Sequence, residues 1–250
     1  MTSDRIELTS EMLSTALGSR WNRADVDAAV KLLASGEGKF PAGVRTLPGE
    51  LVKDVQRERI LVATWNAVAE LGYRDTTVQE ILNRAGISRP TFYEQFGNKE
   101  DCFLAALDSG ARRLGERVET AAAEGGDQWR DRLRMGLEEL LRFVATEPDI
   151  ARVLIVEARA AGRPALLRRD ALLDAFANWI DTEVRDDLPE SPSAIAAAGI
   201  VGGIEAVLYA RISKGETDLL PLLPSLMYFA VLPYGGHAAA AEELSGIARS

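Results

Sequence analysis

The chain has 250 residues, a formal net charge of −9 and a hydrophobic fraction of 47%. These values are typical of a soluble globular protein with one small and one larger domain, and they exclude a disordered chain. No run of about 18 to 20 uninterrupted apolar residues occurs, and the polar start lacks the pattern of a signal peptide, so we expect a cytoplasmic protein without a membrane partner. One cysteine and one histidine exclude an internal disulfide and predict no metal or cofactor site.

Residues 1–50 form an N-terminal extension that we expect to be partly helical or flexible. Apolar residues between Ala24 and Leu33 recur at helical spacing, whereas residues 36–49 are rich in glycine and proline. Arg45 stands just before the next predicted helix, where the basic arms of other helical DNA readers enter a minor groove. A solvated linker is the alternative interpretation of this segment.

A helix predicted over residues 51–71 is followed by two short helices joined by a tight turn. Apolar residues share one face of residues 78–85, and a threonine before them can cap the helix. Gly86 accepts the left-handed backbone that ends a helix. Pro90 is tolerated only in a first turn, so the next helix should begin at Ser88 or Arg89.

The second short helix has an apolar side and a polar side. Phe92 and Phe96 should face inward, which leaves Arg89, Thr91 and Tyr93 on the other sides. A helix pair whose second member exposes a polar face is the form that enters a DNA major groove. Any helical hairpin shows a similar pattern, so a helix pair without DNA remains the alternative at this point.

The order and spacing of residues in this region resemble the DNA-binding domain of the TetR family of transcriptional regulators. The resemblance extends over residues 51–103 and rests on the following positions: Gly72, Thr77, Ile81, Ala85, Gly86, Ile87, Ser88, Phe92, Tyr93, Phe96 and Lys99. It implies an all-α fold with a three-helix helix-turn-helix domain at 51–100 and a larger helical ligand-binding and dimerisation domain at 101–235. The glycines and alanines after Pro233 predict a loose tail at 236–250.

The same resemblance implies a sequence-specific transcriptional regulator. We expect a repressor that binds a palindromic operator as a homodimer and is released by a small, largely apolar effector. A helical dimeric adaptor without DNA binding is the alternative. We expect no enzyme, because the sequence lacks a nucleophile with a base, a metal cluster and a phosphate-binding loop.

Seven residues are candidates for contacts with DNA. Arg89 can bind guanine through two hydrogen bonds, and Thr91 can contact a thymine methyl group. The resemblance assigns phosphate contacts to Thr77, Ser88, Tyr93 and Lys99, and Arg45 is the candidate in the extension. Basic and acidic residues balance within 51–100, so the acidity of the whole chain neither supports nor excludes DNA binding.

From residue 101 onward the pattern is helical, with breaks near Gly125, Pro148, Gly162 and the segment 188–192. The resemblance implies a ligand cavity among the first four of these helices. Large side chains on them are the ligand candidates, and plain core is their alternative role: Phe103, Trp129, Met135, Phe143, Phe176 and Trp179. Cys102 allows either a redox role or a buried, inert thiol.

The last two predicted helices, at about 193–213 and 218–232, are apolar almost all round. A helix of this kind must be covered on every side, and a second copy of the chain is the expected cover, with burial inside one chain as the alternative. The predicted dimer residues are Gly199, Gly202, Ile204, Leu208, Leu223, Leu226, Met227 and Ala230.

Overall fold

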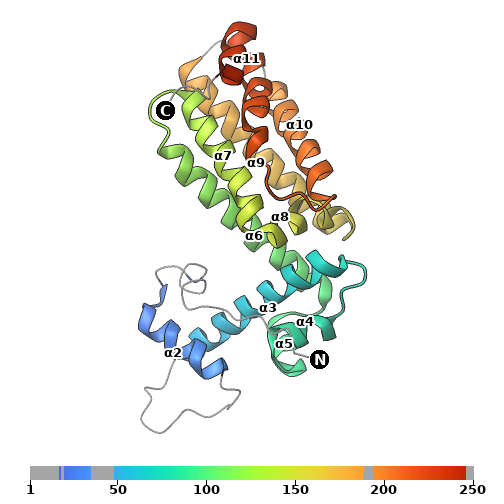
Figure 1. Ribbon diagram of the computed structural model, residues 1–250. Helices are drawn as coiled ribbons and strands as arrows, with labels where there is room; N and C mark the ends of the chain where they lie inside the picture. The colour runs from blue at the N-terminus through green and yellow to red at the C-terminus, as the bar shows by residue number, and fades with distance from the viewer. Residues whose placement is uncertain (1–16, 18–19, 35–47, 189–193, 246–250) are drawn as a thin grey trace. The chain divides into compact units, whose positions relative to one another are not determined.

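The computed structural model describes residues 17, 20–34, 48–188 and 194–245, and within them it contains helices and no strand (Figure 1). The expected all-α fold is confirmed for this part of the chain. The structure divides into two units, Met1–Ala106 and Leu107–Ser250, which are described separately below. The division falls inside one long helix, α6 (Lys99–Ala123).

Unit 1 contains α2 (Arg23–Ala34), α3 (Gly49–Leu71), α4 (Val78–Ala85), α5 (Arg89–Gln95) and the first two turns of α6. The two short helices have the predicted bounds. Helix α3 begins two residues earlier than expected, directly after Pro48, which serves as its N-cap residue. Candidate Arg45 lies outside the described residues.

The N-terminal extension contributes a helix to unit 1. Val26 of α2 is fully buried with Leu51 and Val55 of α3, in a small core of its own. The indole Nε1 of Trp21 donates a hydrogen bond to Asp54 at 3.1 Å. These contacts cover the first turns of α3, which would otherwise leave Leu51 and Val55 in water, and they explain why the helix is regular from its start.

A buried arginine joins α4 to α3 in the main core of unit 1. Arg84 is 8% exposed, and its guanidinium binds Glu70 at 2.8 Å, Glu80 at 3.2 Å and the side-chain oxygen of Asn66. A buried guanidinium needs such partners because its desolvation is costly. The arrangement fixes the position of α4, on which the turn and α5 depend.

Unit 2 is a bundle formed by the rest of α6 with α7 (Trp129–Thr146), α8 (Pro148–Ile155), α9 (Arg163–Asp187), α10 (Ala194–Ile212) and α11 (Leu223–Ser245). Two short 3-10 turns lie between these helices: Glu157–Arg159 between α8 and α9, and Leu220–Leu222 between α10 and α11. The helix expected at 150–160 is therefore shorter, because the chain changes to a 3-10 turn after Ile155.

The expected loose tail from residue 236 is wrong for residues 236–245. Helix α11 continues to Ser245 across a kink at Gly236. Glu243 is 3% exposed and accepts hydrogen bonds from Arg130, at 2.9 Å from Nε, and from Arg134. These ion pairs with α7 hold the last turns in place, and a sequence pattern cannot reveal partners so distant along the chain.

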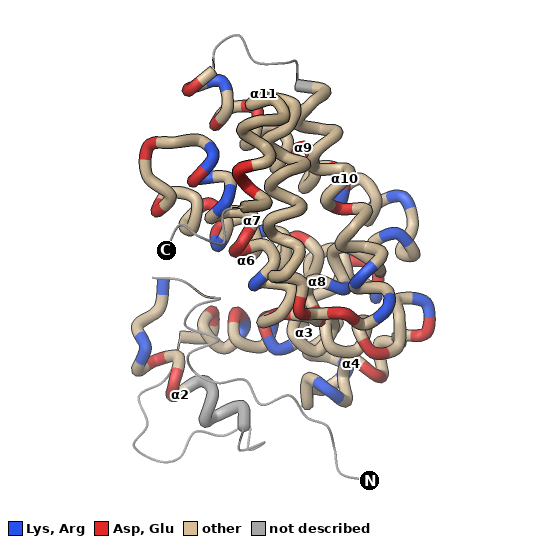
Figure 2. Tube along the Cα trace, turned by 45° about the horizontal axis from the view of Figure 1, so that its top comes forward, with Lys and Arg blue, Asp and Glu red and all other residues tan. Residues whose placement is uncertain are grey.

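Helix α10 is the most apolar helix of unit 2. Residues Ile195–Ile212 are long and apolar enough to cross a membrane by length and composition, although 39% of this segment is buried inside the protein. Helix α10 packs against α8, α9 and α11. No charged residue occurs in the first part of α11, Leu223–His237, and both segments are mostly uncharged in Figure 2. The buried residues of α10 pack within the helical bundle, and the others form apolar surface.

Candidate functional site

Short-range hydrogen bonds cap the starts of α4 and α5. The Thr77 side chain accepts a hydrogen bond from the Glu80 N–H at 3.1 Å, and Ser88 accepts one from the Thr91 N–H at 3.4 Å. Gly86 has φ 63° and ψ 40°, a left-handed conformation that favours glycine. Pro90 lies in the first turn of α5, where its missing N–H costs nothing. The expected capping residues and helix ends are confirmed.

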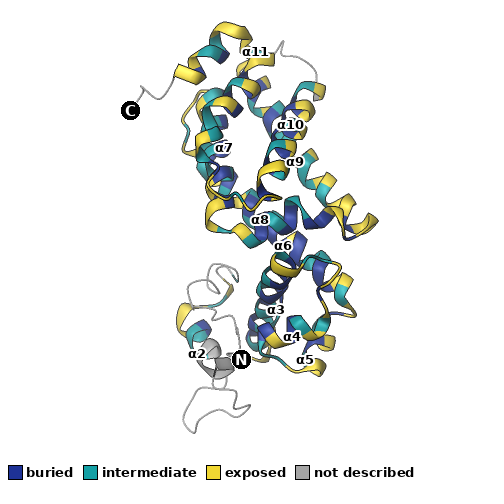
Figure 3. Cartoon of the chain, turned by 45° about the vertical axis from the view of Figure 1, so that its right-hand side comes forward, coloured by how far each residue is buried: buried dark blue, intermediate teal, exposed yellow. Residues whose placement is uncertain are grey.

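Helix α5 buries one side and exposes the other. Phe92 is fully buried and Phe96 is 5% exposed, whereas Tyr93 is 48% exposed. Arg89 is exposed as well and Thr91 is half-buried, so the polar residues lie on the outer side of the helix (Figure 3). The side that faces away from the core therefore carries an arginine, a threonine and a tyrosine, which are side chains that contact bases and phosphates.

Arg89 is held by a residue that the sequence analysis missed. Its Nη2 donates a hydrogen bond to Gln79 Oε1 at 2.8 Å, and Gln79 Nε2 donates one to Asn83 at 2.9 Å. This chain of exposed side chains joins the outer faces of α4 and α5. The signal available in the sequence was the position of Gln79 just after the Thr77 cap, which places it beside the turn.

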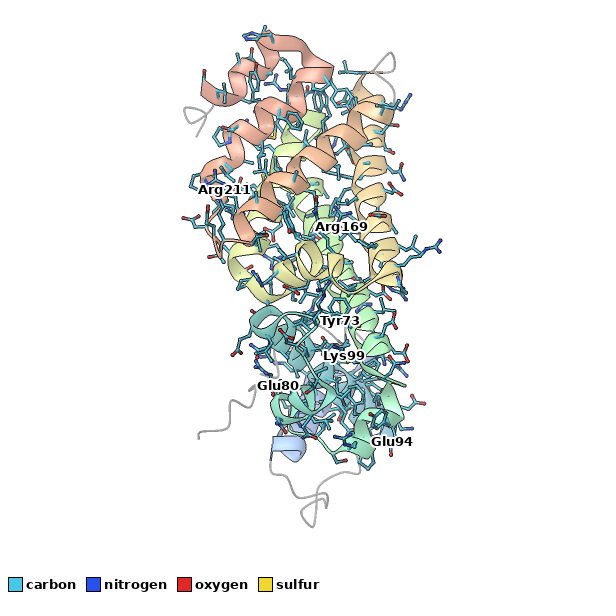
Figure 4. The ribbon with its side chains drawn as sticks, turned by 90° about the vertical axis from the view of Figure 1, so that its right-hand side faces the viewer. Tyr73, Glu80, Glu94, Lys99, Arg169 and Arg211 are labelled. Atoms are coloured by element: carbon cyan, nitrogen blue, oxygen red, sulfur yellow. The ribbon has the colours of Figure 1, made fainter. Side chains whose placement is uncertain are left out.

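Lys99 lies at the start of α6 with its ammonium directed into unit 1 (Figure 4). Nζ donates hydrogen bonds to the carbonyl oxygens of Tyr73, Arg74 and Thr76 at 2.9, 3.4 and 2.8 Å. It also lies 4.4 Å from the centre of the Tyr73 ring. Burial lowers the pKa of Lys99, and Asp75 opposes that shift. These contacts hold the loop before α4, and they occupy the donors that a phosphate contact would use.

Unit 2 contains an apolar cavity enclosed by five helices, with an empty volume of about 750 Å³ that includes space open to solvent. A predominantly apolar lining is typical of small-molecule sites. Its lining comes from α6 to α10: Leu114, Val118, Leu133, Gly136, Leu137, Leu140, Leu154, Ile155, Arg169, Leu172, Leu173, Phe176, Trp179, Ile180, Val201, Ile204, Glu205 and Leu208.

Two of the six predicted ligand residues, Phe176 and Trp179, line this cavity. The other four lie elsewhere. Phe103 belongs to unit 1, where its ring packs on Tyr73 at 4.5 Å. Trp129 packs on Tyr234, the Arg117 guanidinium lies over Phe143, and Met135 is half-buried outside the lining. Helical spacing cannot distinguish a cavity wall from ordinary core, because both faces are apolar.

The predicted dimer residues fall into two groups. Gly199 and Gly202 are exposed with open space beside them, and Leu223 is half-buried. The remaining five are buried within the chain: Ile204, Leu208, Leu226, Met227 and Ala230. The exposed apolar surface of α10 and α11, called the outer face below, consists instead of Ile195, Ala198, Gly199, Gly202, Ala206, Phe229 and Leu232.

Cys102 is fully buried in unit 1, with its sulfur 3.1 Å from the Thr64 hydroxyl oxygen. Burial raises the pKa of the Cys102 thiol to about 12. A neutral, enclosed thiol is a poor nucleophile, so the structure favours the inert role over the redox role. Among the described residues, no group of three His, Cys, Asp or Glu side chains is placed to hold a metal ion.

Comparison with known proteins agrees with this geometry. Residues 60–106 match the family described as "Bacterial regulatory proteins, tetR family". The chain is 29% identical over 154 residues to the transcriptional activator FasR of Mycolicibacterium smegmatis. This alignment covers 55% of this chain and 70% of FasR. The chain is 36% identical over 88 residues to the regulator BetI of Stenotrophomonas maltophilia. This alignment covers 35% of this chain and 45% of BetI. The chain thus spans less than half of BetI.

Solved structures share the fold. The regulator FadR from Bacillus subtilis, in complex with stearoyl-CoA, aligns with a TM-score of 0.61 at 21% identity, over 72% of this chain and 98% of FadR. SmeT, the repressor of a multidrug efflux pump of Stenotrophomonas maltophilia, aligns with a TM-score of 0.58 at 20% identity, over 71% of this chain and 89% of SmeT.

The capped turn, the buried phenylalanines and the exposed polar side of α5 define a helix-turn-helix DNA-binding regulator of transcription. Residues 60–106, which include the turn and α5, match the TetR family.

Proposed function

We propose that the protein is a homodimeric repressor that binds a palindromic operator in the cytoplasm and releases it when a small, largely apolar effector enters the cavity of unit 2. The observation that carries DNA binding is the polar outer side of α5, held by Phe92 beneath it and by Gln79 beside Arg89. One such helix reads only a few base pairs, so a second copy on an inverted half-site is needed for useful specificity.

The outer face of α10 and α11 supports dimerisation. It exposes Ile195 at 80% and Phe229 at 41%, and Gly199 and Gly202 leave room for another helix to approach. Exposed apolar surface with small residues on two adjacent helices suits a two-fold helical interface.

The relatives support a class of effector. One is named a fatty acid metabolism regulator, at 24% identity over 123 residues, and the FadR structure holds stearoyl-CoA. The apolar cavity of unit 2 suits a long hydrocarbon chain, so the effector we propose carries a fatty acyl group. Leu114 and Val118 line the cavity from α6, the same helix whose first turns belong to unit 1. An effector that contacts α6 can therefore bias the conformation of the dimer.

The experiment for DNA binding measures fluorescence anisotropy of a labelled duplex from the region upstream of the protein's own gene. We expect Arg89→Ala to weaken operator binding by about 1 to 3 kcal/mol and to affect random DNA much less, because a bidentate contact with guanine is lost. Arg112→Ala, an exposed arginine of unit 2, is the matched control. Wild-type protein that fails to bind any upstream duplex would favour the adaptor alternative.

The experiment for dimerisation uses two glycines that have open space beside them inside helices. We expect Gly202→Glu to produce monomers in sedimentation equilibrium, because a charge would enter the helix contact, whereas Gly115→Glu on α6 should leave the dimer intact. Each change places the same residue in a helix, so the two variants share the effect on helix stability. A Gly202→Glu variant that stays dimeric would place the interface elsewhere.

A further inference from the structure

Two charged residues border the cavity of unit 2, although the surface that the cavity exposes is almost wholly apolar. Arg169 of α9 and Glu205 of α10 are the charged residues among its described lining. The other lining residues are aliphatic, aromatic or glycine. A ligand made only of hydrocarbon would leave this charged pair without any role in recognition, whereas a ligand with one polar end matches the whole lining.

Glu205 is the buried centre of an ion cluster. Its side chain is 9% exposed and accepts two hydrogen bonds from Arg159 Nη2, at 2.6 and 2.7 Å. Arg169 Nη2 lies 2.9 Å from the same carboxylate, and the other end of that guanidinium pairs with the exposed Asp170 at 2.8 Å. Arg159 also lies 4.0 Å above the Tyr209 ring of α10. Glu205 thus ties α10 to α9 and to the 3-10 turn after α8.

Arg169 keeps one donor unused. Its Nε is buried and finds no hydrogen-bond partner in the described part of the chain. A buried donor without an acceptor is costly, and most such groups in proteins are satisfied. Arg169 lines the cavity and lies among the helices of unit 2 (Figure 4), so a turn of its side chain would bring the guanidinium against an acceptor held there.

We propose that Arg169 turns toward the cavity to bind the oxygen-bearing end of the acyl effector, and that this movement competes with the pairing of Arg169 to Glu205. The inference rests on the proposed function and deepens it. The hydrocarbon chain of the effector lies along the apolar walls, and the carbonyl or carboxylate oxygen at its end accepts a hydrogen bond from the Arg169 guanidinium. Because Glu205 belongs to α10, which carries the outer face, loosening the Arg169 to Glu205 tie transmits effector binding to the dimer.

The test measures binding of three probes that share one hydrocarbon tail: oleate, oleoyl-CoA and oleylamine. Quenching of tryptophan fluorescence reports occupancy because Trp179 lines the cavity. Wild-type protein should bind oleate or oleoyl-CoA, and oleylamine much more weakly, since its ammonium is cationic and offers no acceptor. Binding of oleate alone identifies a free acid as the effector, and binding of oleoyl-CoA alone identifies the thioester.

Arg169→Met is the decisive variant, and Arg168→Met is its matched control. Arg168 is the preceding residue of α9, where it pairs with the exposed Asp108 at 3.0 Å and does not line the cavity. We expect Arg169→Met to weaken the binding of the acyl probe by about tenfold to a hundredfold, the value of one charged hydrogen bond, and Arg168→Met to leave it unchanged. Equal affinity of wild type and Arg169→Met overturns the inference while the proposed effector class stands.

Glu205→Gln keeps the shape of the carboxylate and weakens its hold on Arg169, so it tests the competition even if Arg169→Met folds poorly. We expect this variant to bind the acyl probe several-fold more tightly, and its operator affinity to respond less to the probe. Unchanged probe affinity and an unchanged operator response would show that the ion cluster is only structural. Wild-type protein that binds none of the three probes overturns the acyl effector of the proposed function, and the role of Arg169 with it.

Discussion

The outer side of α5 and the ion cluster of unit 2 use arginine in opposite settings. Arg89 is exposed and touches a neutral amide, Gln79, so water screens its charge until a partner covers it. Arg169 lies in an apolar wall beside Glu205, where a partner changes a balance between buried charges. The first setting suits contacts that add together and weaken with salt, and the second suits a contact that competes with an existing one.

The assignment of an exposed outer side to α5 can be tested most strongly with two neighbouring aromatic residues of that helix. Phe92 is fully buried and Tyr93 is 48% exposed. We expect Phe92→Ala to lower the free energy of unfolding by about 3 to 5 kcal/mol because it leaves a cavity in the core of unit 1. Tyr93→Ala should change it by less than about 0.5 kcal/mol and weaken DNA binding instead.

Urea denaturation measures the first effect and fluorescence anisotropy the second. If Tyr93→Ala destabilised the protein as much as Phe92→Ala, the outer side of α5 would be part of the core. The proposed DNA-binding surface would then be incorrect.

Local signals explain why the helix-turn-helix could be predicted from the sequence. The cap at Thr77, the left-handed Gly86 and the first-turn Pro90 act within a few residues of themselves, and the bounds of α4 and α5 follow from them. The pairing of Arg89 with Gln79 spans ten positions and two helices. It depends on how α4 and α5 are packed, so the sequence alone did not indicate it.

The arrangement of unit 2 depends on contacts between residues far apart along the chain. Arg130 and Glu243 are separated by 113 positions, and Arg159 and Glu205 by 46. Apolar periodicity identifies a buried face but not the helix that covers it. For this reason the sequence assigned Phe143 and Trp129 to the ligand and Ile204 and Leu208 to the dimer, whereas the cavity has Ile204 and Leu208 in its wall.

Lys99 provides the next test, because its sequence position predicts a phosphate contact and its structure shows three carbonyl partners. We expect Lys99→Met to lower the free energy of unfolding by about 1 to 3 kcal/mol, since the carbonyl oxygens lose a charged donor. The salt dependence of operator binding should stay the same. Lys214→Met, an exposed lysine of unit 2, is the control for stability. If Lys99→Met instead reduced the slope of log affinity against log salt concentration by about one, Lys99 would be shown to contact a phosphate.

Cys102 is the substitution site for which we expect the smallest change in the free energy of unfolding at neutral pH. Its full burial contrasts with the exposed residues of α5. The Cys102 pKa is raised by burial from 9.0 to about 12, so between these values the folded protein keeps a proton that the unfolded chain releases. The resulting stability is complete below about pH 9 and is lost as the pH rises toward 12. Cys102→Ala should flatten this decline, and pH-dependent urea denaturation measures it.

The same pKa shift predicts that native Cys102 resists alkylation. At pH 8 iodoacetamide should modify the thiol in urea but not in the folded protein, because the thiolate is the reactive form and the sulfur is fully buried. Fast alkylation of the native protein would mean that the region around Thr64 and Cys102 opens readily. A core that opens in this way could not hold α3 and α6 firmly enough to fix α5 for DNA, so the result bears on the reading helix as well as on the cysteine.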